Sequence, residues 1–451
     1  MRYNGLLILA IVMAAVCSCG QPELVPEQEV STPEVQEPRI PEKVETVETV
    51  PEEEKATEPD ETVPSESLTQ RKDIPLTRTQ AEYAKSGCNA FALNLFKEVA
   101  NDANMVISPL GVAFDLGMIN NGASGNTKAE IDRVLGYEED SLGMMNTFFK
   151  TMMENANEID PSTSLEIANA AVLNSSHLPF HDGFKNAIES YYFAELFSLN
   201  FLTDDVMGLV NSWCDEKTHG LIPSFLNNQP SNQEYAHFLN ALYFKGIWSQ
   251  QFKKGDTMKE PFTSISDERI TVDMMYKIDR VNYVESDQYS AVSLPFGNKA
   301  FQMVFILPQG EADLDDMKDT LNLDTWNELI SGLHEEDVFI KIPSFEINCT
   351  TNLRKQLYNL GVKDAFTPYA ANFRLLTDEM VVITDVIQKA VIKVDEQGSE
   401  AAAVTDVEYG SIASEPETEE HPFFHANRPF IYAITEVSTG AIFFIGQYTG
   451  K

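Results

Sequence analysis

The sequence predicts an α+β fold, in which helical and extended segments follow one another without the regular alternation of a doubly wound sheet. Between residues 80 and 100, Phe91, Leu95, Phe96 and Val99 recur at helical spacing and share one face. Later in the chain, short runs rich in β-branched and aromatic residues indicate strands. The 451 residues, 43% of them hydrophobic, are enough for one large or two ordinary globular domains.

Local start and stop signals define further helices. Ser108 and Pro109 are a capping residue and a proline suited to the first helical turn. The run from Thr127 to Glu130 is a capping-box pattern, and Gly136 can end the helix that follows. Two more helices are expected at residues 184–193 and 207–217. Strands are expected at residues 165–173, 235–244, 270–275, 291–294, 301–307, 338–342 and 390–395.

The first twenty residues have the pattern of an export signal. Arg2 precedes an apolar run from residue 6 to residue 16, which is too short to be interpreted as a spanning helix. The stretch from Val16 to Cys19 resembles the lipobox of bacterial lipoproteins, so we expect a signal peptide over residues 1–19 and a lipid anchor on Cys19. Cys19 is favoured over Cys17 because a small residue precedes it, and the alternative is a plain secretory signal cut near Ala15.

A lipidated Cys19 would place the protein in a bacterial cell envelope, held on a membrane and facing the periplasm or the cell surface. The plain signal would instead give a secreted protein. The next segment has a different composition: residues 21–72 contain fifteen acidic and five basic residues, a net charge of −10, with eight prolines and no aromatic residue. Such a stretch cannot bury enough apolar surface to offset its chain entropy. Residues 20–78 are therefore predicted to be a disordered tether, and residues 79–451 the folded domain.

Charge and motifs exclude several functional classes. The formal net charge of −38 argues against nucleic acid and against adsorption on an anionic membrane. The sequence contains no C-x-x-C pair, H-E-x-x-H, G-x-S-x-G, Walker loop, G-x-G-x-x-G or EF-hand loop. We therefore expect no enzyme, no cofactor, no metal site and no disulfide framework. The five cysteines are Cys17, Cys19, Cys88, Cys214 and Cys349.

Residues 396–413 have a strand-like pattern in a loop-like setting. Gly398 permits a bend that a residue with a Cβ would resist. One set of alternate positions is uncharged, whereas three of the five residues in the other set are acidic, which is the period of a strand. Residues 414–420 have loop composition. By pattern alone the segment could be a hairpin with one polar face. The uncharged set is Ser399, Ala401, Ala403, Thr405, Val407 and Tyr409.

Five separated stretches resemble the serpin family. Residues 396–403 resemble the hinge of inhibitory serpins, and residues 104–109 resemble the start of the shutter helix. Residues 238–248 resemble the central strand, while residues 426–431 and 440–446 resemble the two closing strands. The five stretches occur in the expected order. The resemblance implies a serpin fold with three β-sheets, about eight to nine helices and an exposed reactive-centre loop at about residues 396–425.

The resemblance also implies a function, namely a suicide-substrate inhibitor that traps the acyl-enzyme of a serine protease when the cleaved loop inserts into the main sheet. Counting from the hinge places the reactive bond at Ile412–Ala413, with Ser411 and Ser414 as alternatives. A small aliphatic residue suits elastase- or subtilisin-like enzymes. The alternatives are inhibition of papain-like cysteine proteases and a non-inhibitory binding module. The implied hinge is Glu396, Gly398, Ser399, Glu400, Ala401, Ala402 and Ala403.

The resemblance assigns the shutter and breach of the sheet to Ser108, Asn240, Trp248 and Gln388. Gln388 stands where family members usually carry histidine, and we expect its amide to join Ser108 and Asn240. The acidic stretch at residues 414–420 is longer than usual. It is either extra solvated loop without a specific role or a segment that selects a protease with a basic rim. The implied partner is a protease in a covalent complex with a monomeric inhibitor.

Overall fold

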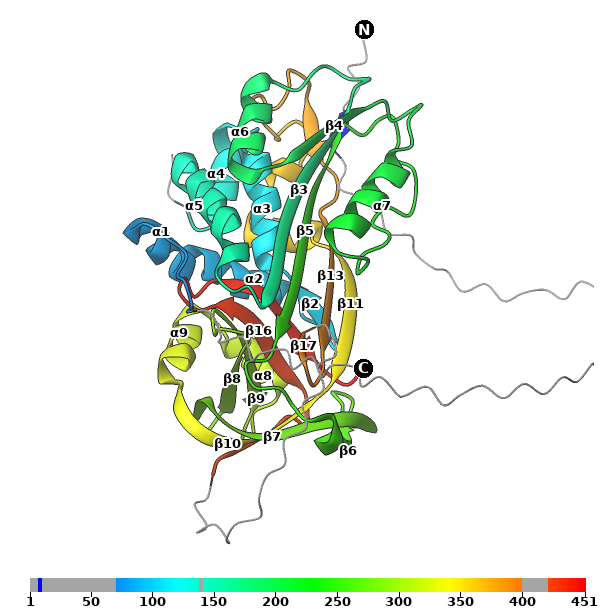
Figure 1. The fold of residues 1–451 in the computed structure, drawn as a ribbon. Coiled ribbons are helices and arrows are strands. Elements are labelled where there is room, and N and C mark those ends of the chain that lie inside the picture. The colour runs from blue at the N-terminus through cyan, green and yellow to red at the C-terminus, as the bar shows by residue number, and fades with distance from the viewer. Residues whose placement is uncertain (1–6, 10–69, 138–140, 400–420) are drawn as a thin grey trace, which may run out of the picture. The chain divides into compact units, whose positions relative to one another are not determined.

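The computed structural model describes residues 7–9, 70–137, 141–399 and 421–451 (Figure 1). The α-helices are α1 (Arg78–Tyr83), α2 (Asn89–Val99), α3 (Pro109–Asn120), α4 (Gly125–Val134), α5 (Leu142–Asn155), α6 (Asp182–Tyr192), α7 (Val206–Lys217), α8 (Leu314–Thr320), α9 (Leu323–Gly332) and α10 (Arg354–Leu360). The strands are β1 (Leu7–Leu9), β2 (Met105–Ile107), β3 (Thr163–Asn174), β4 (Glu195–Leu199), β5 (Ala236–Ile247), β6 (Met258–Thr263), β7 (Arg269–Glu285), β8 (Tyr289–Pro295), β9 (Phe301–Pro308), β10 (His334–Pro343), β11 (Phe345–Asn352), β12 (Val381–Ile383), β13 (Ile387–Val394), β14 (Gly398–Ser399), β15 (Phe423–His425), β16 (Phe430–Glu436) and β17 (Ile442–Tyr448).

The described strands form three sheets. A six-stranded sheet has the order β11-β13-β14-β5-β3-β4, and its outer ladders are long, with β3 and β5 paired over eleven positions. A nine-stranded sheet has the order β15-β10-β7-β8-β9-β16-β17-β2, with β6 paired to β7. The third sheet pairs β1 with β12 in parallel. The seventeen-residue strand β7 is long enough to pair with β6, β8 and β10, which keeps the larger sheet continuous.

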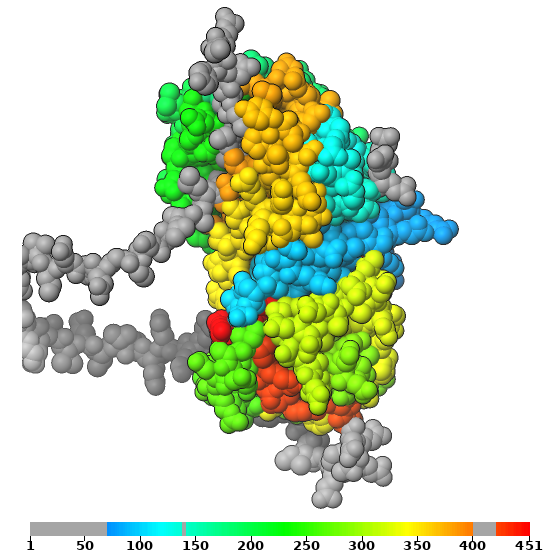
Figure 2. Space-filling view, turned by 180° about the vertical axis from the view of Figure 1, so that it is seen from behind, coloured from blue at the N-terminus to red at the C-terminus, as the bar shows by residue number. Residues whose placement is uncertain are grey.

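The helices pack around these sheets. Helices α1 and α2 are joined by one π-helical turn, Ala84–Cys88, so residues 78–99 form one helical stretch. Counting that stretch once, the described residues contain nine α-helices, and the predicted α+β class is confirmed. Figure 2 shows the blue band of α1 and α2 crossing the middle of the face opposite to that of Figure 1. Helix α3 contacts β5 and β17 and therefore lies between the two large sheets.

Most of the local predictions are confirmed. Ser108 caps α3, since its Oγ accepts a hydrogen bond from the Gly111 amide and Pro109 opens the helix. All seven predicted strands lie within or overlap described strands. The capping box at Thr127 is wrong, because α4 already begins at Gly125. Thr127 lies inside that helix, and its buried Oγ accepts from the Asn372 amide at 3.0 Å, so a tertiary contact replaces the cap.

Within the part of the chain that the structure describes, no helix has the length and apolar character needed to cross a lipid bilayer.

Candidate functional site

The six-stranded sheet is incomplete at its centre. Strand β13 is paired along its whole length with β11, and β5 is paired with β3 at every position except Ile247. The part of the chain described between them is the two-residue strand β14, which pairs with Val394 on one side and with Gly246 and Ile247 on the other. Among the described residues, no register pairs β5 directly with β13. We call this line between β5 and β13 the seam.

One end of the seam is closed by side chains from three segments. Trp248, directly after β5, donates from its indole Nε1 to the Asp395 carbonyl at 2.9 Å and stacks on Phe296 with ring centroids 4.4 Å apart. The Trp248 amide donates to the Gln397 carbonyl at 2.8 Å, and Thr257 Oγ1 donates to Glu396 Oε1 at 2.7 Å. Trp248 is 2% exposed. These contacts fix the point at which the chain leaves β13 and turns toward β14.

The turn itself depends on Gly398. Its φ of +155° is a backbone conformation that side-chain-bearing residues rarely adopt, and a Cβ at this position would collide with the Gly246 carbonyl. The Asp395 carboxylate accepts from the Gln397 and Gly398 amides at 2.9 and 3.3 Å. The chain therefore reverses within four residues, and Ser399, 3% exposed, enters the seam.

Further along the seam, Gln388 on β13 binds the start of α3 through both ends of its amide. Its Oε1 accepts from the Ser108 amide at 2.9 Å, and its Nε2 donates to the Ser108 carbonyl at 2.8 Å. The expected contact between Gln388 and Ser108 is present, although it runs through the backbone of Ser108. This two-point contact ties β13 to the helix beneath the seam.

Asn240 on β5 does not pair with Gln388 or Ser108 in the described contacts. Its Nδ2 donates to Oδ1 of Asn169, which lies directly opposite on β3, and Asn169 in turn donates to the Tyr192 carbonyl. Sequence analysis did not identify Asn169, because nothing in the sequence indicates the register of β3 against β5. Among the described contacts, Gln388 and Asn240 on the two sides of the seam thus bind different partners.

The family model described as Serpin (serine protease inhibitor) matches residues 86–450. This is most of the chain. The chain belongs to the serpin family.

Its relatives support this assignment. Iripin-8 of Ixodes ricinus is 30% identical over 373 residues, 80% of this chain and 91% of that protein. A leukocyte elastase inhibitor of Xenopus tropicalis is 29% identical, covering 82% of this chain and 99% of that protein. The crystal structure of the thermophilic serpin Tengpin in the native state has a TM-score of 0.76 at 27% identity, covering 84% of this chain and 96% of that chain. Serpin relatives of this kind are protease inhibitors, which bind target proteases and are not enzymes.

In this serpin the structure brings together three of the predicted hinge residues, Glu396, Gly398 and Ser399, beside Trp248. The remaining predicted residues of the loop and the predicted lipid anchor lie outside the described residues. They are Glu400, Ala401, Ala402, Ala403, Ser411, Ile412, Ala413, Ser414 and Cys19.

An acid on α3 with one buried carboxylate oxygen was missed by sequence analysis. Asp115 lies one helical turn beyond Gly111, where a Cβ would come within 2.5 Å of Asn240 Oδ1, so the two residues share the face that points toward β5. The Asp115 Oδ1 atom is buried and has no hydrogen-bond partner among the described residues. Burial raises the pKa of this carboxyl well above its ordinary value. A single aspartate in a helix pattern does not signal this in a sequence.

The chain returns from the loop through β15. This three-residue strand pairs in parallel with β10, and among the described residues it has no partner on its other side. Its last residue, His425, lies 3.5 Å from Glu260 Oε2, while Glu260 Oε1 pairs with Lys341 at 2.5 Å. Burial, and to a smaller extent Lys341, lowers the pKa of His425. Lys341 is the nearer of these two partners of Glu260.

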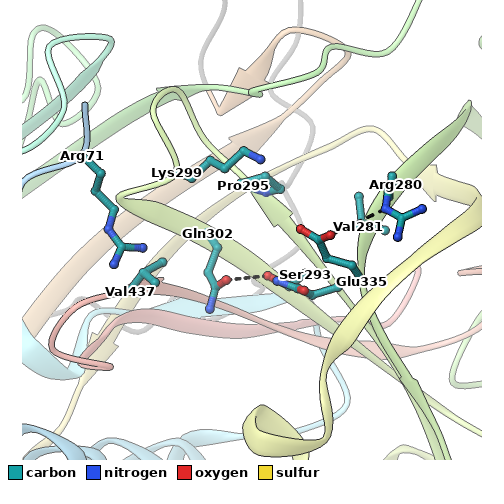
Figure 3. Close-up of a pocket in the computed structure, with 10 residues that line it drawn as sticks. Arg71, Arg280, Val281, Ser293, Pro295, Lys299, Gln302, Glu335 and Val437 are labelled. Carbon is teal, nitrogen blue, oxygen red and sulfur yellow. Dashed lines mark hydrogen bonds and ion pairs between the residues drawn. The ribbon is translucent and has the colours of Figure 1, made fainter. Parts of the chain in front are cut away.

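The lining of a small cavity on the nine-stranded sheet shows no catalytic constellation. A cavity of about 150 Å³ on the nine-stranded sheet is lined by Arg71, Arg280, Lys299, Gln302 and Glu335 among others (Figure 3). These groups provide neither a nucleophile with an adjacent base nor a set of metal ligands. No cluster of three or more histidine, cysteine or acidic side chains suited to a metal occurs among the described residues.

Proposed function

We propose that this serpin is a suicide-substrate inhibitor of elastase- or subtilisin-like serine endopeptidases. The observation that supports the proposal most strongly is the seam. Strands β5 and β13 have long outer ladders, and among the described residues they are bridged only at one end, where Gly398 and Ser399 pair with Val394, Gly246 and Ile247. A strand that continues from Ser399 would run antiparallel to both neighbours and pair with each of them. The incomplete sheet is therefore a receptor for the chain that follows β14.

The sequence after β14 suits that receptor. Ala401 and Ala403 have the same parity as Ser399, which is buried in the seam, so they would enter without steric resistance. Residues on the other parity, including Glu400 and Asp406, would face water. Non-inhibitory serpins usually have bulky, charged or proline residues at these hinge positions, whereas this chain has three consecutive alanines.

The mechanism follows from this order of events. The catalytic serine of the protease attacks the carbonyl of Ile412 and forms an ester with it, while the peptide bond to Ala413 breaks. Ser411 and Ser414 are the alternatives for the position of the reactive bond. The freed chain from Ser399 onward then enters the seam and carries the acyl-enzyme along the sheet. The small aliphatic residue at the proposed bond favours an elastase- or subtilisin-like pocket over one that requires arginine or lysine.

We also propose a place of action. A lipid on Cys19 and an acidic tether would hold a monomeric inhibitor domain away from a membrane of the bacterial cell envelope. The tether was predicted over residues 20–78, but in the structure Ile74 is already buried against the body, where its amide donates to Ser438 Oγ at 3.1 Å. The anchor supports a protective role at the membrane surface, where an incoming protease would meet the loop. This placement can be tested by extracting membranes. Detergent should release the anchored protein whereas high salt should not, and Cys19→Ala should no longer associate with the membrane.

The function is tested by mixing the full chain with pancreatic and neutrophil elastases, subtilisin, trypsin and papain, followed by denaturing gels. We expect a denaturant-resistant adduct with elastase or subtilisin, and a released peptide that begins at Ala413 or a neighbouring residue. An adduct with papain alone would transfer the proposal to cysteine proteases. Cleavage of the loop without any adduct would contradict suicide inhibition and support the non-inhibitory alternative.

A further inference from the structure

Next to the point where the loop rejoins the body, three apolar side chains form a row across three strands, with the two outer ones exposed and the middle one, Phe339, half-buried. Ile278 on β7 lies opposite Phe339 on β10, and Phe339 lies opposite Phe423 on β15. Ile278 is 55% exposed and Phe423 is 51% exposed. The rings of Phe339 and Phe423 are 6.5 Å apart. We call these three residues the apolar strip.

The strip lies on the outer face of the sheet and is not part of the core. Neighbouring side chains alternate across a strand, and the inward positions Val281 on β7 and Val338 and Ile340 on β10 are buried. Large apolar side chains that line up on a solvent face lose the free energy that burial would supply, and contiguous exposed patches mark sites where another molecule binds.

Charged groups lie on both sides of the strip. On one side Arg280 lies 3.6 Å from Glu335 and 3.6 Å from Asp337, and Arg280 and Glu335 also line the cavity of Figure 3. On the other side are Lys341 and its partner Glu260. An apolar centre with a polar rim is the usual anatomy of a protein–protein interface.

The position of the strip indicates which protein would cover it. β15 lies beside β10 at the same end of the molecule as β7 (Figure 1). Ten positions separate Ala413 from Phe423, so even a fully extended chain spans at most about 35 Å between them. A protease domain of about 200 residues has a radius of gyration of about 17 Å. These lengths are comparable, so a protease seated on the proposed reactive bond comes within reach of β15.

We propose that the apolar strip is an exosite, a second docking surface for the body of the target protease outside its active site. The inference rests on the proposed function, because the loop brings the protease there. The strip would add contacts before acylation and so raise affinity for proteases with an apolar rim beside the active-site cleft. A second copy of this chain is the competing occupant, since β15 has an unpaired edge among the described residues.

The test uses the double variant Ile278→Thr, Phe423→Thr in the full chain, because threonine keeps the strand preference while removing apolar area. Binding is measured to pancreatic elastase and to subtilisin, each with its active-site serine replaced by alanine, so that no acylation occurs. We expect the double variant to bind at least one of them about tenfold more weakly than the parent. The matched control is Leu202→Thr, which alters a leucine that is 75% exposed after β4 and should leave binding unchanged.

Each outcome decides the inference. Three results would overturn the exosite. The double variant could bind both inert proteases with dissociation constants within twofold of the parent's, or the parent could bind neither protease. Leu202→Thr could also weaken binding as much as the double variant does. A dimer of the parent that the double variant dissolves, with protease binding unchanged, would assign the strip to a second copy. Active proteases test the proposed function separately. If the parent forms adducts with them but the double variant binds the inert proteases as the parent does, only the exosite is rejected. If the double variant binds the inert proteases more weakly but the parent forms no adduct, only the trapping mechanism is rejected.

Discussion

The two large sheets of this serpin differ in how completely their strands are paired. In the nine-stranded sheet β16 and β17 are buried at every position, and the ladder runs without interruption from β15 to β2. In the six-stranded sheet the outer ladders are long, but among the described residues β5 and β13 are bridged only at one end, by two residues. The described strands of the larger sheet are thus paired throughout, whereas those of the smaller sheet leave β5 and β13 without a shared ladder. This difference supports the proposal that the six-stranded sheet accepts a further strand.

The largest effect is expected from obstructing the seam. Ser399→Arg would bury a charge at a position that is 3% exposed, which carries a large desolvation cost, and Ala403→Pro would remove a ladder donor from the entering strand. Either variant should be cleaved as a substrate, with the number of inhibitor molecules used per protease rising at least about tenfold. Titration of residual protease activity measures this number.

The matched control for that prediction is Ser266→Arg, since Ser266 is exposed in the turn between β6 and β7 of the complete sheet. It should trap protease as the parent does. An unchanged inhibitor requirement in both Ser399→Arg and Ala403→Pro would contradict insertion as the mechanism.

The next effect concerns the whole molecule. Proteolytic cutting of the loop near Ile412 should let the chain after β14 complete the six-stranded sheet, and each new ladder bond adds about 1 kcal/mol net. The cut chain should therefore melt at a temperature more than about 10 °C above that of the uncut chain. Calorimetry of the two forms measures the shift, and equal melting temperatures would mean that the seam does not accept a strand.

A smaller effect is expected at Gln388. Gln388→Ala removes two hydrogen bonds to Ser108 and leaves the backbone of Ser108 without these partners. The free energy of unfolding should fall by about 1–3 kcal/mol. Because β13 is then less firmly tied to α3, inhibitory activity should also be lost faster on storage. Urea unfolding and timed activity assays measure the two quantities.

Gln302→Ala is the corresponding control in the complete sheet, where Gln302 accepts one hydrogen bond from Ser293 at 2.7 Å. It should lower stability without shortening the lifetime of activity. An equal loss of lifetime in both variants would show that general destabilisation, and not the seam, controls the active form.

The smallest effect is expected at Asp115. Burial raises the pKa of this carboxyl in the folded state, so the folded protein binds its proton more tightly than the unfolded chain does. Its contribution to stability is present below the ordinary aspartate pKa of about 3.9 and is lost as the pH rises through the folded-state value. Asp115→Asn should therefore unfold at a higher urea concentration than the parent at neutral and alkaline pH, with the gain shrinking in acid. A gain that is independent of pH would exclude ionisation as the cause.

Much of the fold could be predicted because its signals are local. Ser108 and Pro109 form a cap wherever the following residues are helical, and Gly398 permits a turn that other residues resist. The capping box at Thr127 failed because the decisive partner, Asn372, is 245 residues away. Asn169 and Asp115 were missed for the same reason. Their roles depend on strand register and on packing between elements, and a local sequence pattern contains no information about either.

The sequence by itself determined the α+β class, the secondary structure of most segments and the resemblance to serpins. These depend on side-chain periodicity, on turn chemistry and on motifs that each span only a few residues. Only the tertiary structure decided that, among the described residues, β5 and β13 are bridged by β14 alone, and that Gln388 binds the Ser108 backbone while Asn240 binds Asn169. It also decided that Ile278, Phe339 and Phe423 form one row on the outer face of the larger sheet. These arrangements join residues tens to hundreds of positions apart, and the free energies that set them come from packing and hydrogen bonds between elements.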